Sequence, residues 1–194
     1  MFEVSFQYRF EAAHRFIKSA SIPCMTPHGH SWRVFLRIFS SQPLNTNEMV
    51  EEFSLLKGAW KRFIKETVDH SFFHHCEDPI LPALREHIPQ FRSLPFPGDP
   101  TTELIAACFL RKAQAIGVAS GLSDPNCPLN IAVEIQETQT NRVTLSLANL
   151  EDLDSLAPTL CSHIGWWDDA DLEARWIRPH LPQRSYPAQP SAPH

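Results

Sequence analysis

The sequence predicts an α+β fold: a four-stranded antiparallel sheet with two helices on one face, in the order ββααββ. Three observations indicate this fold. Apolar and polar residues alternate with period two near the start of the chain and again after residue 130. Two longer segments between these regions carry apolar residues at helical spacing. Hairpins on both sides of a helix pair favour a single sheet that the helices cover.

The first strand is predicted over residues 1–14, where one parity is apolar and ends in a histidine. Its members are Phe2, Val4, Phe6, Tyr8, Phe10, Ala12 and His14. A second strand is predicted over about 28–39, with Trp32 and Val34 on its apolar face. Residues 17–27, which contain two prolines, are expected to form the loop between them.

The first helix is predicted over 51–68 from an apolar stripe of Phe53, Leu56, Trp60, Phe63 and Ile64. Glu51 and Glu52 near its start suit the helix dipole. The region from Asp78 to Pro100 is rich in proline. We expect a loop there, with at most a short helix around 80–88.

The second long helix is predicted over about 100–117. Asp99 is expected to be its N-cap and Pro100 its first residue, because Pro is well tolerated at that position. Gly117 is expected to end it. Two strands follow, over 131–137 and 143–147, joined by a turn at 138–141.

Residues 1–149 are therefore predicted to form one domain, and residues 150–194 a C-terminal extension. A helix is expected near 168–177 in this extension. The final sixteen residues hold five prolines, and this composition predicts an extended or flexible tail.

Composition excludes several classes of function. The net charge of −5 argues against nucleic acid as a partner, because phosphate binding usually needs a basic surface. No apolar run approaches the ~20 residues that span a bilayer. The charged N-terminus is unlike a signal peptide, so we expect a cytoplasmic protein. The five cysteines show no C-x-x-C pair, which argues against a disulfide framework.

A candidate metal site comes from three histidines. His28 and His30 are two residues apart on a predicted strand, so their side chains share a face. His14 ends the neighbouring strand and lies opposite them if the two strands form a hairpin. Three imidazoles with one open position are typical of a catalytic zinc site. The alternative is that each histidine is an ordinary polar residue near the end of a strand.

Three further positions could carry chemistry. Cys24 lies four residues before His28, and a nearby dication would favour its thiolate. Asp69 and His70 follow the first helix, where the carboxylate could support the charged imidazole if a turn brought them together. Glu137 lies on an apolar strand face, where a carboxylate is costly unless paired. Each could instead be structural: a buried thiol, a helix end and a solvated strand end.

These motifs, in this order, resemble the 6-pyruvoyltetrahydropterin synthase family. FEAAHRF at 10–16 is similar to its first zinc-ligand strand, and Cys24 followed by HGH is similar to its nucleophile and zinc segment. Residues 51–70 resemble its first helix with the catalytic Asp-His. DPTTELIA at 99–106 resembles its Asn-Pro-Thr-x-Glu helix start, and EIQET at 134–138 resembles its pterin-anchoring strand.

The resemblance implies the tunnelling fold, in which subunits join their sheets into a barrel with active sites between them. It implies Zn²⁺ on His14, His28 and His30. It implies proton handling by Cys24, Asp69 and His70, and pterin binding by Glu137 with Thr101 and Thr102. Arg15 and Lys18 are the nearest candidates to contact a triphosphate.

The short Cys-x3-His-Gly-His spacing resembles the bacterial branch, 6-carboxytetrahydropterin synthase. That branch is implied to be a zinc-dependent lyase of queuosine and deazapurine synthesis. It converts 7,8-dihydroneopterin triphosphate to 6-carboxy-5,6,7,8-tetrahydropterin, releasing acetaldehyde and triphosphate. Two alternatives stay open: a pyruvoyl-forming synthase that eliminates triphosphate, and a homologue that binds zinc or pterin without turnover.

Overall fold

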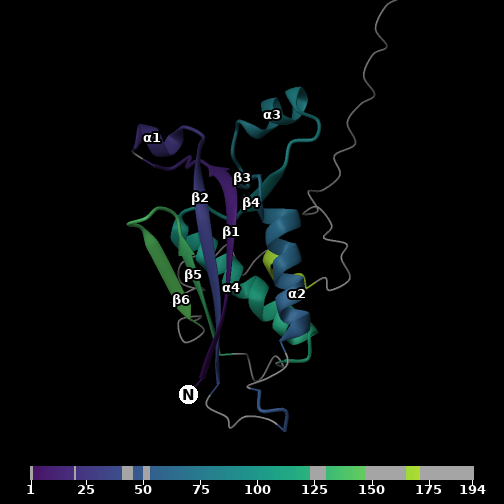
Figure 1. Ribbon diagram of the computed structural model, residues 1–194. Coiled ribbons are helices and arrows are strands. Elements are labelled where there is room, and N and C mark those ends of the chain that lie inside the picture. The colour runs from purple at the N-terminus through teal and green to yellow at the C-terminus, as the bar shows by residue number, and fades with distance from the viewer. Residues whose placement is uncertain are drawn as a thin grey trace, which may run out of the picture.

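The computed structural model of the chain describes residues 2–19, 21–40, 46–49, 53–122, 130–146 and 165–170. A long hairpin of two strands crosses the whole molecule, with the remaining strands on either side of it (Figure 1). Together the strands form one sheet in the order β4-β3-β1-β2-β5-β6. Their bounds are β1 (Phe2–His14), β2 (His28–Ser40), β3 (Ser71–His75), β4 (Ser93–Phe96), β5 (Ile131–Gln136) and β6 (Arg142–Ser146).

The β1–β2 hairpin confirms the first two predicted strands and sets the register of the site. Phe10 pairs with Trp32, and His14 pairs with His28 across the antiparallel ladder. Phe10 and Trp32 are buried, while Glu3 and Ser5 on the opposite parity are exposed. Because side chains alternate along a strand, the same parity that fills the core also carries the three histidines.

The prediction of four antiparallel strands was incomplete, because the sheet has six strands and is mixed. β1 pairs with β3 in parallel, and β3 pairs with β4 in parallel. All five residues of β3 are buried, so this strand shows no polar alternation that a period-two search could detect. β4 contains Pro95, which is compatible with its position at the edge of the sheet.

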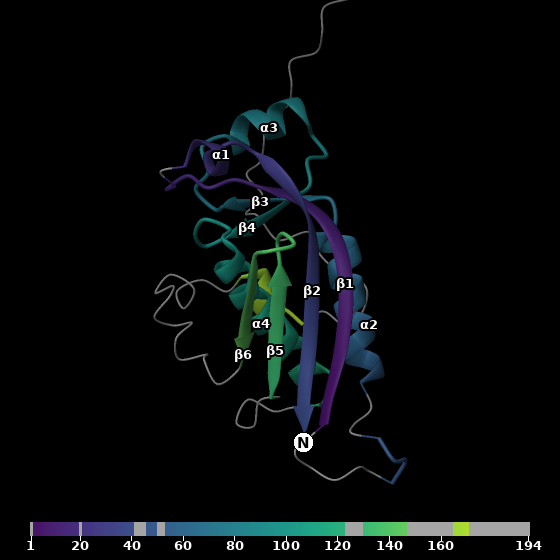
Figure 2. The same cartoon turned by 60° about the vertical axis from the view of Figure 1, so that its left-hand side comes forward.

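Two long helices, α2 (Ser54–Arg62) and α4 (Thr102–Ala119), lie behind the sheet (Figure 2). Their apolar faces pack with the inward side chains of the strands into one core. Aromatic rings dominate this core. Phe10 stacks on Trp32 with ring centroids 6.0 Å apart, and Phe63 lies edge-on to Phe109 with ring centroids 5.3 Å apart. This packing fixes the inner face of the hairpin on which the site is built.

The first predicted helix differs from the structure at both ends. Glu51 and Glu52 lie outside the described residues, and α2 begins at Ser54. Residues Phe63–Val68 continue as a π-helical turn. This π-helical turn ends at Asp69, whose N–H donates to the Ile64 carbonyl at 2.8 Å.

The predicted caps of the second helix were wrong. Thr101, not Asp99, is the N-cap of α4, and its hydroxyl accepts the Leu104 N–H at 3.3 Å. The helix continues through Gly117 to Ala119. Gly121, at φ +74°, is the glycine that adopts the left-handed conformation beyond the helix end.

The connecting segments contain two short helices. The predicted loop 17–27 includes α1 (Ile22–Met25), with proline in its first turn. The expected short helix near 80–88 is confirmed as α3 (Leu81–His87).

Part of the C-terminal extension packs on this domain. Trp166–Asp168 form a 3-10 turn, and the Trp166 Nε1–H donates to the Pro95 carbonyl at 2.7 Å. The fully buried Lys112 donates to the Trp166 carbonyl at 3.0 Å and also to the Asp169 carbonyl. Most of the predicted helix at 168–177, and the proline-rich tail, lie outside the described residues.

Candidate metal centre and active site

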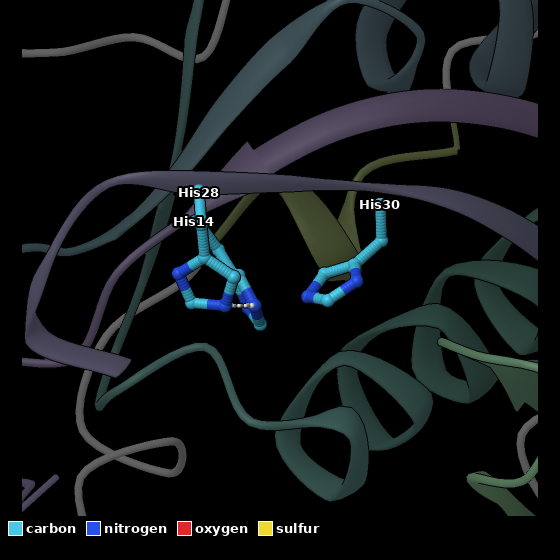
Figure 3. Close-up of side chains that lie close together, drawn as sticks. All are labelled: His14, His28 and His30. Atoms are coloured by element: carbon cyan, nitrogen blue, oxygen red, sulfur yellow. Dashed lines mark hydrogen bonds between the residues drawn. The ribbon is translucent and has the colours of Figure 1, made fainter. Parts of the chain in front are cut away.

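The three predicted histidines come together on one side of the hairpin (Figure 3). His14 is the last residue of β1, and His28 and His30 begin β2. One ring nitrogen from each lies within 4.8 Å of the other two. The Nε2 atoms of His14 and His28 are only 3.0 Å apart.

The outer nitrogens of two of these rings are fixed by backbone carbonyls. His14 Nδ1 donates to the Pro100 carbonyl at 3.0 Å, and His28 Nδ1 donates to the Thr26 carbonyl at 2.8 Å. A carbonyl oxygen only accepts, so each Nδ1 carries the proton and each neutral ring presents an Nε2 lone pair. Two lone pairs at this distance repel unless a cation lies between them. A carbonyl behind a metal-binding imidazole is a common arrangement in proteins.

Burial favours the neutral form that binds metal. Burial lowers the pKa of His14 to about 4, although the Pro100 hydrogen bond opposes the shift. Burial also lowers the pKa of His30, against the attraction of Glu137. His30 Nε2 is buried and has no hydrogen-bond partner among the residues that the structure describes. A buried ring nitrogen of this kind is expected to have a ligand.

Glu137 lies beside the imidazoles, immediately after β5. Its Oε1 is 3.5 Å from His14 Nε2 and 3.7 Å from His30 Nε2. Its Oε2 accepts from Asn141 Nδ2 at 2.5 Å, within the turn that joins β5 to β6. The Glu137 carboxylate therefore borders the three-histidine cluster.

Cys24 lies in α1, within the loop that joins the two histidine-bearing strands. The Phe16 N–H donates to the Cys24 carbonyl at 2.9 Å, which closes this loop at its base. The thiol is free and partly exposed. In the described part of the chain it makes no hydrogen bond to the three imidazoles.

Asp69 and His70 interact as neighbours because the backbone turns between them. His70 has φ +58°, and its Nδ1 is 3.0 Å from Asp69 Oδ2. Asp69 Oδ1 also accepts the Glu11 N–H at 2.9 Å, and the His70 N–H donates to the Glu11 carbonyl at 2.6 Å. Two hydrogen bonds to the backbone of Glu11 in β1 therefore stabilise the turn that this pairing requires.

His70 borders a cavity beside the β1–β2 hairpin. His70 lines an open cavity of about 660 Å³ together with Glu11, Ala13, Gly29 and Ser31. On β1 and β2, Glu11, Ala13 and Ser31 have the opposite parity to the three histidines, so their side chains point to the other face of the sheet. Ala12 and His30 also line this cavity. Glu11 and Ser31 beside His70 thus face away from His14 and His28.

The remaining sequence candidates differ in whether their polar groups already have a partner and in how exposed they are. Thr101 Oγ1 is used as the helix cap, and Thr102 is buried next to it. Arg15 Nε lies 3.1 Å from the buried Asp78 carboxylate, so this arginine is already paired. Lys18 is exposed and is the more accessible of the two proposed phosphate contacts.

Sequence reasoning missed the groups that orient the ligands. The carbonyls of Thr26 and Pro100 belong to the backbone, and no residue type signals their role. Asp99 was assigned to helix capping, yet its carboxylate binds the Ile17 and Lys18 amides, each at 2.8 Å. An acid preceding a proline at a helix start gives no sign of such a distant partner.

A mixed sheet backed by two helices, with three imidazoles converging on its inner face, defines the class as an α+β protein of the tunnelling fold with a candidate metal centre. The sequence model of the 6-pyruvoyl tetrahydropterin synthase family matches residues 3–147, and the chain belongs to this family.

Curated relatives carry the name of the carboxy branch. The 6-carboxy-5,6,7,8-tetrahydropterin synthase of Aquifex aeolicus is 32% identical, with 55% of this chain and 75% of that protein covered. The enzyme of the same name from Rickettsia conorii is 28% identical over the same shares. These relatives support an enzyme that acts on a pterin.

Solved structures confirm the fold. An uncharacterized protein from Wolinella succinogenes has a TM-score of 0.60 at 21% identity, covering 75% of this chain and 98% of that one. A catalytic-residue mutant of 6-pyruvoyltetrahydropterin synthase from Plasmodium vivax has a TM-score of 0.55 at 19% identity, covering 75% and 96%. Among the described residues, no helix is long and apolar enough to span a bilayer.

Proposed function

We propose that this chain is a zinc-dependent 6-carboxytetrahydropterin synthase. It would convert 7,8-dihydroneopterin triphosphate and water to 6-carboxy-5,6,7,8-tetrahydropterin, acetaldehyde and triphosphate. The observation that carries the proposal is the cluster of three ring nitrogens, one each from His14, His28 and His30. The family match and the names of the curated relatives support the pterin substrate.

The donor set suits zinc. Two ligands at ~2.0–2.1 Å in a tetrahedral site lie about 3.3 Å apart, close to the 3.0 Å between the Nε2 atoms of His14 and His28. Three neutral nitrogens leave one position open, as in catalytic zinc sites. Bound there, Zn²⁺ would supply Lewis-acid chemistry toward the hydroxyls of the substrate side chain.

Protons would be moved by the chain's own groups. The Cys24 thiol lies in the loop between the histidine-bearing strands and would exchange a proton with the substrate side chain. His70, whose Nδ1 lies 3.0 Å from Asp69 Oδ2, would act as the second proton carrier, because this contact fixes the orientation of the ring.

The pterin would be held at the edge of the histidine cluster. The Glu137 carboxylate can accept two N–H groups of a flat heterocycle, provided that the substrate displaces Asn141. Thr101 and Thr102 at the start of α4 would lie beside the ring.

The complete site would form between copies of the chain. The cavity that contains His70 is also lined by Glu11 and Ser31, whose side chains face away from the imidazoles, so an Asp69–His70 pair from a neighbouring subunit would complete each zinc site. Residues 1–149 would be the catalytic domain and 150–194 an extension. The pathway would be queuosine and deazapurine synthesis in the cytoplasm.

The test is to incubate the zinc-loaded protein with dihydroneopterin triphosphate and to separate the products by chromatography. Acetaldehyde with a carboxypterin supports the proposal. A pyruvoyl pterin would instead assign the chain to the triphosphate-eliminating branch. Bound zinc without any turnover would make it a binding homologue.

A further inference from the structure

Asp99 joins two parts of the chain that are far apart in sequence. It lies between β4 and α4, and its carboxylate reaches the stretch that follows His14. Oδ1 accepts the Ile17 N–H at 2.8 Å and Oδ2 accepts the Lys18 N–H at 2.8 Å. Both oxygens are therefore engaged by successive backbone amides, and such charge-assisted bonds are stronger than neutral ones.

The stretch that Asp99 holds is the base of the Cys24 loop. The Phe16 N–H donates to the Cys24 carbonyl at 2.9 Å, one residue before Ile17. The Phe16 ring also packs edge-on against His14, with ring centroids 5.1 Å apart. Fixing Ile17 and Lys18 thus restricts the backbone between His14 and Cys24, on which the distance between the imidazole and the thiol depends.

The next residue contacts the metal centre itself. The Pro100 carbonyl accepts the Nδ1–H of His14 at 3.0 Å, and Thr101 caps α4. Two consecutive residues, Asp99 and Pro100, therefore contact the Cys24 loop and the histidine cluster respectively. Pro100 holds a candidate metal ligand through its backbone, and Asp99 holds the Cys24 loop through its side chain.

We propose that Asp99 is a positioning residue that fixes the Cys24 loop relative to the three-histidine centre. The role of Cys24 rests on the proposed function, whereas the attachment of the loop does not. A carboxylate suits this position, because each of the two N–H donors then has its own acceptor oxygen. An asparagine would offer one oxygen and would place its amide NH₂ against the other backbone N–H.

The decisive variant is Asp99→Asn, which keeps the size of the side chain and removes one acceptor. In the zinc-loaded full chain, we expect the Ile17 and Lys18 amides to exchange hydrogen at least about tenfold faster. Iodoacetamide should alkylate Cys24 at a rate changed by at least about threefold, measured on the Cys24 peptide by mass spectrometry. Zinc content should stay unchanged, because His14 is held by a backbone carbonyl.

Glu86→Gln is the matched control, since it removes an exposed negative charge on α3 and should change neither rate. Unchanged exchange and unchanged alkylation in Asp99→Asn would overturn the proposal. Faster exchange throughout the chain, with loss of zinc, would also overturn it by showing a general loss of stability. None of these measurements needs turnover, so a failure of the proposed synthase activity would be seen separately. If the protein is active, Asp99→Asn should lower kcat with little change in KM.

Discussion

At the scale of single residues, the candidate site depends on ring nitrogens whose directions are set by backbone carbonyls. The Nδ1 atoms of His14 and His28 are both occupied, so each ring has one nitrogen left for a metal. His30 adds a buried nitrogen that accepts or donates no hydrogen bond within the described part of the chain. This division of roles between the two nitrogens of a ring is what distinguishes the cluster from three ordinary histidines.

The first prediction concerns His30→Ala. We expect zinc affinity to fall at least about 100-fold. Removing a metal ligand should lower the affinity at least as much as removing a group that hydrogen-bonds to a ligand. Metal content after dialysis against a weak chelator would measure the change. His87→Ala, at the end of α3, is the control and should retain the metal. Full zinc content in His30→Ala would contradict the assignment of this ligand.

The second prediction concerns the fully buried His74, which is not part of the cluster. Burial lowers its pKa, and the nearby Arg85 adds to the shift. The unfolded chain therefore binds this proton more readily, so the free energy of unfolding falls as pH drops below about 6.5 toward the lower folded pKa. His74→Asn keeps a donor for the His75 carbonyl and removes this titration.

Urea unfolding of the metal-free protein at about pH 7.5 and about pH 5 would measure this effect. The loss of stability between the two conditions should be smaller in His74→Asn than in the parent chain. His14 and His30 contribute to both proteins, so the difference isolates His74. Equal losses would show that His74 does not titrate in this range.

At the scale of elements, the long strands and helices could be predicted, whereas the short buried strands could not. β1 and β2 alternate over thirteen residues each, and each has one buried face. β3 is buried on both sides, and its five residues give no period. The three metal-ligand candidates were accessible to sequence reasoning because they continue the parity of those long strands. The roles of Pro100 and Asp99 depend on tertiary contacts, which no local pattern encodes.

The third prediction concerns the docked segment 165–170. Its backbone accepts two hydrogen bonds from Lys112, and Arg111 pairs with Asp168 at 2.6 Å. Ending the chain after Ser146 removes these two carbonyl acceptors and the Arg111–Asp168 ion pair. We expect a loss of about 3–5 kcal/mol in the free energy of unfolding, measured by urea denaturation, because a hydrogen bond to a charged group contributes about 1.5–3 kcal/mol.

Lys112→Met provides the matched comparison for this truncation. In the full chain it should destabilise, because the carbonyls of Trp166 and Asp169 lose their donor. In the shortened chain the same substitution should destabilise less, because these two hydrogen bonds are already absent. If Lys112→Met has the same effect in both chains, the segment does not stabilise the domain through this lysine.

At the scale of the whole molecule, the two faces of the sheet carry different parts of the proposed active site. The imidazoles share the inner face with the aromatic core, whereas Glu11 and Ser31, which line the cavity with His70, point to the other face. Under the proposed function, a single chain would present two partial sites. An assembly of identical chains would place the outer part of one copy against the inner part of another.

The fourth prediction tests this arrangement by complementation. His30→Ala should abolish activity through loss of the metal, and His70→Asn through loss of the proton carrier. Asparagine is chosen because it tolerates the positive φ of residue 70. When the two variants are co-expressed with different tags and purified as mixed assemblies, activity should return to about a quarter of the parent value. Random mixing makes about one pair of facing half-sites in four intact.

Mixed assemblies of His30→Ala and His28→Ala are the control and should stay inactive, since both variants damage the same half-site. An inactive His30→Ala and His70→Asn mixture, with both tags present, would mean that Asp69 and His70 serve the site of their own chain or none.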